Sequence, residues 1–207
     1  MNLAVLHVDA ALIVVDKPSG LLSVPGRGAH LQDCMASRVQ AVFGDALVVH
    51  RLDMATSGLM LFARGIEAQR ALGRAFEQRA VHKRYEAVVH GRMPDAQGEI
   101  DLPLMADWPN RPLQKVDHAH GKPSTTRYRV IGFEEGRTRV ELEPVTGRAH
   151  QLRVHLLAIG HPIVGDALYA PPDVRDAAER LLLHATQLRF AHPAGGASVS
   201  VDSPVPF

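Results

Sequence analysis

The chain has 207 residues, 46% of them hydrophobic, so it can bury a sizeable core and wholesale disorder is not expected. Its 23 Lys and Arg nearly balance 22 Asp and Glu, so a nucleic-acid binder of this composition must gather its cations on one face. A single cysteine, Cys34, excludes an internal disulfide framework. Met1 to Leu6 lacks a signal-peptide pattern and no apolar run is long enough to cross a bilayer, so we expect a cytoplasmic protein with no membrane partner.

Apolar periodicity predicts the elements in chain order. The first part of the chain is expected to contain strands over 12–15, 48–49 and 59–62, and helices over 33–43 and 66–79. The rest is expected to contain strands over 85–89, 126–131 and 138–142, a helix over 148–159 capped by Thr146, and late strands or a short helix near 181–183, 188–190 and 199–201.

Strands outnumber helices in this pattern, and many strands follow one another with no helix between them. That order predicts an α+β fold with a mixed, largely antiparallel sheet and flanking helices. No repeat, low-complexity run or linker interrupts the chain, so a single domain over residues 1–207 is expected.

A Pro-rich segment between Arg92 and Lys122 is predicted to be irregular, with Trp108 and Arg111 at its centre. Long irregular segments inside compact domains are often functional. A surface excursion capped by one aromatic side chain explains the pattern equally well.

Three polar clusters are candidates for chemistry. Asp53 lies between two predicted strands, in a stretch that also offers hydroxyls and a glycine, although an ordinary Asx-turn would use the same residues. The stretch 148–155 is basic and predicted to be helical; its Arg153 would keep a nearby carboxylate ionised, or the cations would only form a solvated helix face. Tyr85 follows two cations and suits base stacking, although a tyrosine of the core is commoner.

Other chemistries find less support in the sequence. Twelve histidines are present, but no cysteine pair, no His-Glu-x-x-His run and no carboxylate cluster completes a metal site, so no metal is expected. The glycine-rich loops of nucleotide-binding proteins and the nucleophile elbow of serine hydrolases are also missing from the sequence.

Several motifs in order resemble the RluA family of pseudouridine synthases, over nearly the whole chain. The nine residues 50–58, His-Arg-Leu-Asp-Met-Ala-Thr-Ser-Gly, are the most specific of them. The other matching segments are Lys17-Pro18-Ser19-Gly20-Leu21, Lys83-Arg84-Tyr85, the basic motif over 146–155, the stretch 161–166 and the stretch 181–185.

The resemblance implies an enzyme that isomerises uridine in RNA without a cofactor. It makes Asp53 the essential carboxylate, with Arg153 holding that carboxylate ionised and Tyr85 stacking on the uracil. Leu182 and Leu183 would form an apolar wall against the detached base, or would simply pack the core. Binding of the RNA backbone is expected to use arginines, namely Arg51, Arg70, Arg74, Arg84, Arg111 and Arg148.

Within that family, residues 107–112 resemble a member that modifies both transfer RNA and large-subunit ribosomal RNA. The expected partners are therefore a transfer-RNA anticodon stem-loop and a 23S ribosomal RNA stem-loop, bound by a monomer without an N-terminal S4 domain. Two other functions remain open at the level of sequence. An inactive RNA-binding module of the same fold would not need Asp53, Tyr85 and Arg153 unaltered, and a glycosidase would normally need a second catalytic carboxylate.

Overall fold

The computed structural model describes residues 3–207, which divide into two compact units. Unit 1 contains the chain up to Lys83 together with His184–Pro206, and unit 2 contains Arg84–Leu183 with Phe207. Met1 and Asn2, part of the stretch in which no signal peptide is expected, lie outside the described residues. The expectation of a single domain stays a prediction.

Unit 1 is built on a sheet whose strands run in the order β1 (Ala4–Val8), β2 (Leu12–Lys17), β4 (Ser57–Arg64) and β11 (Leu183–Ala191). Two further strands join it, β3 (Ala46–Val48) beside β4 and β12 (Ser198–Asp202) beside β11. The pairing of β4 with β11 is parallel and short, joining Ser57 to His184 and Gly58 to Ala185, whereas the other pairs in this unit are antiparallel.

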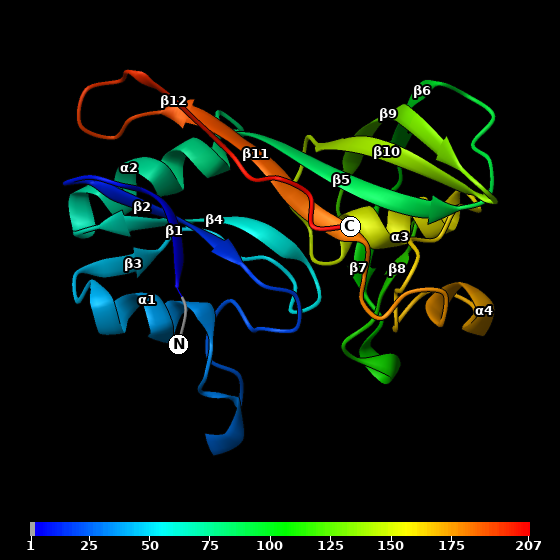
Figure 1. Ribbon diagram of the computed structural model, residues 1–207, viewed down its shortest axis with the longest axis horizontal. Coiled ribbons are helices and arrows are strands. Elements are labelled where there is room, and N and C mark those ends of the chain that lie inside the picture. The colour runs from blue at the N-terminus through cyan, green and yellow to red at the C-terminus, as the bar shows by residue number, and fades with distance from the viewer. Residues whose placement is uncertain (1–2) are drawn as a thin grey trace. The chain divides into compact units, whose positions relative to one another are not determined.

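Helices cover both faces of the central strands in unit 1. Figure 1 shows α2 (Ile66–Glu77) and α1 (Met35–Val42) on opposite sides of β2 and β4. Burial on both faces explains why β2 and β4 are continuous apolar runs, with no exposed surface on Leu12–Val15 or Leu59–Ala63. The polar segment 50–58, which follows β3, therefore leads directly into β4, a strand that is buried on both faces.

In unit 2, antiparallel strands follow the order β5 (His82–His90), β10 (Arg137–Pro144), β9 (Thr125–Glu134) and β6 (Gln97–Asp101). Every second residue of β10 is buried, and α3 (Gln151–Ala158) packs against β9 and β10. A two-stranded ribbon, β7 (Leu104–Ala106) with β8 (Gln114–Val116), and the short helix α4 (Pro172–Arg175) complete the unit.

The predicted α+β class with largely antiparallel pairing is confirmed, but two local expectations are wrong. The segment 92–122 is less irregular than predicted, because it contains β6, β7, β8 and a short 3-10 helix over Trp108–Asn110. These strands are only three to five residues long, too short for apolar periodicity to reveal them.

The second error concerns the start of α3. The helix begins at Gln151 rather than at Arg148, and its N-cap is His150, whose φ of 53° is left-handed. Thr146 does not cap the backbone of the helix; its hydroxyl donates instead to the side-chain oxygen of Gln151, which also accepts from the N–H of Arg148. A buried amide side chain thus takes the place of the predicted cap.

Within residues 3–207, no helix is both long and apolar enough to cross a membrane.

Candidate active site

The segment 50–58 forms the loop between β3 and β4 and the start of β4, all within unit 1. Arg51 is exposed, Leu52 is buried and Asp53 is partly buried. The backbone turns tightly after the aspartate, since the N–H of Thr56 donates to the carbonyl of Asp53 over 3.1 Å. The carboxylate is therefore presented by a short turn immediately before a buried strand.

The turn that follows β2 holds this loop on one side. Lys17, with no exposed surface, donates from Nζ to the carbonyl of Met54 at 3.1 Å and to two carbonyls of its own turn. The N–H of Gly20 donates to the same Met54 carbonyl at 2.9 Å, and the hydroxyl of Ser19 donates to the carbonyl of Ala55 at 2.7 Å. The first motif found in the sequence thus contacts the backbone just after Asp53.

Ser23 holds the loop on the other side of Asp53. Its buried hydroxyl accepts from the N–H of Leu52 at 3.0 Å and donates to the carbonyl of Leu52 at 2.6 Å. These contacts involve only backbone atoms of the loop. The position of Asp53 is therefore set by hydrogen bonds that do not depend on its carboxylate. Sequence reasoning missed Ser23, which lies two residues beyond the matched motif.

His50 anchors the first residue of the segment. Its Nε2 accepts from the N–H of Leu61 in β4 at 3.0 Å, and its ring stacks on Phe76 of α2 with centroids 4.8 Å apart. Burial, aided by the nearby ammonium of Lys83, lowers the pKa of His50 to about 3. The imidazole is thus neutral near pH 7, with its proton on Nδ1.

This lowered pKa predicts a specific loss of stability in acid. The unfolded chain binds a proton at His50 below a pKa of about 6.5, whereas the folded chain does so only near 3, so stability falls as the pH drops through that interval. Between pH 7 and pH 5 we expect His50 to account for a loss of about 2 kcal/mol. His50→Gln keeps an acceptor without the titration, and urea unfolding at pH 7, 6 and 5 should show a flatter profile. Parallel profiles for the two proteins would contradict the assignment.

Gly58 allows β11 to approach the end of the segment. Its φ is 109°, and a Cβ added there would collide with the backbone of Ala185. Only glycine tolerates both conditions. The first two residues of β4 are thereby brought against His184 and Ala185, which belong to the 181–185 motif.

A buried chain of hydrogen bonds starts from this contact. Ser57 Oγ lies 2.8 Å from His184 Nδ1, His184 Nε2 lies 3.0 Å from Ser203 Oγ, and Ser203 donates to Asp16 at 2.8 Å. Because a carboxylate only accepts, the Ser203 hydroxyl proton is committed to Asp16, and His184 must donate from Nε2. The other ring nitrogen, Nδ1, meets the hydroxyl of Ser57. Asp16 is therefore linked through Ser203 and His184 to a hydroxyl of the 50–58 segment.

In unit 2, Arg153 is buried and bound by a carboxylate that sequence reasoning had not assigned to it. Its Nε and Nη2 donate to the two oxygens of Asp166 at 2.8 and 2.6 Å, with both side chains at most 4% exposed. Asp166 also accepts from the N–H groups of Leu168 and Tyr169. The basic stretch is therefore not simply a solvated helix face, since this bidentate pair fixes the guanidinium plane.

Tyr169 completes the surroundings of Arg153. The guanidinium lies 5.0 Å from the centre of its ring, and the hydroxyl lies 2.6 Å from His150 Nδ1 and accepts from the N–H of Gln114. Nothing in its local sequence indicated this role. The contacts join three segments that are well separated along the chain, around residues 114, 150 and 169.

The other predicted site residues of unit 2 differ in exposure. Tyr85 is half-buried in β5, opposite Leu142 of β10. Leu182 and Leu183 are buried, so core packing explains them as well as a wall against a base would. Arg148 is exposed and reaches the carbonyl of Pro123 at 3.4 Å.

Arg111 lies on the ring of Trp108 at 3.4 Å from its centroid, and the tryptophan is 62% exposed. A flat cation stacked on an exposed aromatic presents a surface that suits nucleic-acid bases. Residues 3–207 contain no group of three or more His, Cys, Asp or Glu side chains placed to hold a metal ion.

Comparison with known proteins identifies the class. A family model described as RNA pseudouridylate synthase matches residues 11–158. The dual-specificity RNA pseudouridine synthase RluA of Escherichia coli O6:H1 is 51% identical over 99% of this chain and 94% of its own length. The protein of the same name from Vibrio cholerae is 53% identical over 91% of this chain and 77% of its own length.

Solved structures agree with the sequence relatives. Human RNA pseudouridylate synthase domain containing 1 superposes with a TM-score of 0.81 at 30% identity, covering all of this chain and 84% of the human one. The chain belongs to the RNA pseudouridylate synthase family. It is a pseudouridine synthase, an enzyme of the isomerase class, and the resemblance drawn from its motifs is confirmed.

Proposed function

We propose that this enzyme isomerises uridines in both a transfer-RNA anticodon stem-loop and a 23S ribosomal RNA stem-loop, in the cytoplasm and as a monomer. The observation that carries the proposal is the 51% identity, over nearly the full chain, to a relative named for dual specificity. The stacked pair of Arg111 and Trp108 lies in the segment that suggested this subgroup.

In the proposed reaction, the bond between ribose C1′ and uracil N1 breaks and the base rejoins the sugar through C5. The C5 proton is lost at the end and N1 gains one, so no electrons are exchanged. Asp53 acts on the sugar, as nucleophile or as base, and its fixed backbone supports this role because catalysis needs an accurately placed carboxylate. The target uridine must leave its stack to reach such a pocket.

Arg153 is proposed to keep the Asp53 carboxylate ionised. Its bidentate bonds to Asp166 fix the plane of the guanidinium, and an opposite charge nearby favours the ionised form of a carboxyl group. Tyr85 is proposed to stack on the uracil and to assist the late proton transfer at C5. Leu182 and Leu183 would exclude water from the detached base, while Arg51, Arg111 and Arg148 would contact the RNA.

Incubation of the purified enzyme with unmodified transcripts of both RNAs tests the proposal. Pseudouridine should form at defined positions in each, without added cofactor and in the presence of a chelator. Mapping of modified positions in RNA from cells with and without the protein should identify the same uridines. Modification confined to one RNA class would refute dual specificity, and release of free uracil would indicate a hydrolase instead.

A further inference from the structure

Some exposed arginines of this enzyme are neutralised by neighbouring carboxylates. Of those expected to contact RNA, Arg70 is paired with Glu67 and Arg84 with Glu141. Because the net charge is only +1, cations without such partners are better candidates for RNA contacts. Within residues 3–207, Arg189 and His82 are exposed, and their side chains form no ion pair or hydrogen bond.

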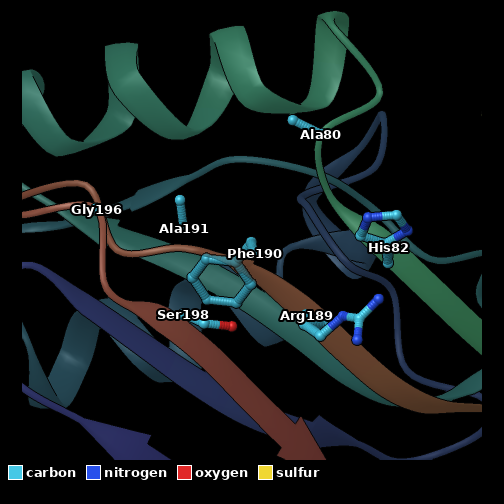
Figure 2. Close-up of a pocket in the computed structure, with 7 residues that line it drawn as sticks. All are labelled: Ala80, His82, Arg189, Phe190, Ala191, Gly196 and Ser198. Carbon is cyan, nitrogen blue, oxygen red and sulfur yellow. The ribbon is translucent and has the colours of Figure 1, made fainter.

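These two side chains line the same hollow of unit 1, with a volume of about 290 Å³. Figure 2 shows them side by side, with Arg189 coming from β11 and His82 from the start of β5. The remaining lining residues are small or apolar: Ala80, Phe190, Ala191, Gly196 and Ser198. Arg79, exposed and also without an ion pair in the described part of the chain, immediately precedes Ala80.

The polar groups of the hollow favour an anion. The guanidinium of Arg189 has only donors, His82 offers a ring N–H, and Ser198 offers a hydroxyl. On β12, the residue opposite Arg189 is Ser200, which carries no charge. The nearest acid along β12, Asp202, accepts from the side chain of Gln187. An oxyanion with several acceptor oxygens, such as a phosphodiester, matches this set.

The hollow lies at a distance from the Asp53 loop that RNA can span. Arg189 is four residues along β11 from Ala185, which is in register with Gly58 at the end of that loop. At about 3.3 Å per residue, the two points on the strand are about 13 Å apart. This is too far for the target nucleotide itself but corresponds to a few base steps of a duplex.

We propose that the hollow lined by His82, Arg189 and Ser198 binds a backbone phosphate of the substrate RNA, a few nucleotides from the target uridine. The inference rests on the proposed RNA substrates and adds a contact outside the catalytic loop. It explains why two exposed nitrogen-bearing side chains converge without an acidic partner.

The test compares Arg189→Ala and His82→Ala with Arg127→Ala, a control whose arginine is also exposed but is paired with Glu99. Filter binding to the anticodon stem-loop at several salt concentrations measures affinity, and single-turnover assays measure the rate. Arg189→Ala should weaken binding about three- to tenfold and reduce the slope of log affinity against log salt by roughly 0.7–0.9. The saturated rate should stay at the wild-type value, and Arg127→Ala should change neither quantity.

Equal affinities and salt slopes for Arg189→Ala and Arg127→Ala would overturn the inference. It would also fail if inorganic phosphate shifted the NMR signals of His82 in an Arg189-dependent way while RNA affinity stayed unchanged, because the hollow would then be a small-anion site. A wild-type enzyme that binds the stem-loop in an Arg189-dependent way but forms no pseudouridine would instead refute the proposed substrate. The two failures are therefore distinguishable.

Discussion

Asp53→Asn is expected to abolish pseudouridine formation while leaving RNA binding nearly intact. An amide keeps the size of the carboxylate but has neither its charge nor its basicity, and both proposed roles at the sugar require an ionised group. The rate should fall by at least about 10²–10⁴-fold, the range that a positioned acid or base contributes. Conversion of uridine in the stem-loop, followed in single-turnover reactions, measures the loss.

The fold of this variant should survive, because Lys17, Gly20 and Ser23 hold the loop through its backbone. Thermal melting and filter binding check folding and affinity, and mass spectrometry excludes deamidation back to aspartate. Asp45→Asn is a matched control in the same unit, since Asp45 pairs with Arg64 at the surface. A folded Asp53→Asn enzyme with near wild-type activity would show that another residue performs the chemistry.

Asp166→Ala is expected to lower the free energy of unfolding by about 3–5 kcal/mol, because it leaves the charge of Arg153 buried without its bidentate partner. The same change removes the acceptor for two backbone N–H groups of the following turn. If Arg153 also keeps Asp53 ionised, misalignment of the guanidinium should reduce the catalytic rate of whatever protein remains folded.

Urea unfolding measures this loss, and Asp176→Ala provides the comparison. Asp176 and Arg175 form an equally short ion pair, but their side chains are 65% and 45% exposed, so its removal should cost about 0–1 kcal/mol. Similar losses for the two variants would indicate that burial of the Arg153–Asp166 pair contributes little. Replacing the pair together by apolar residues of similar volume should recover much of the stability.

Features with a local physical cause could be read from the amino-acid order. The run 12–15 is apolar at every position because helices bury both faces of β2, and this pattern predicted the strand. The segment 50–58 singled out Asp53 because the matching residues are contiguous. The fold class followed in the same way, since the order of strands and helices restricts how they can pack.

Features that depend on partners distant along the chain could not be read in this way. Lys17 is polar in sequence yet fully buried, because the carbonyls that receive it come partly from a loop 37 residues away. Arg153 was singled out as a site residue, but its position in the basic stretch gave no sign that it would be buried in a pair with Asp166. The hollow beside Arg189 joins residues around 80 with residues around 190. Packing between distant segments decides which polar groups are buried and which of them pair. The periodicity within one segment carries no information about such packing.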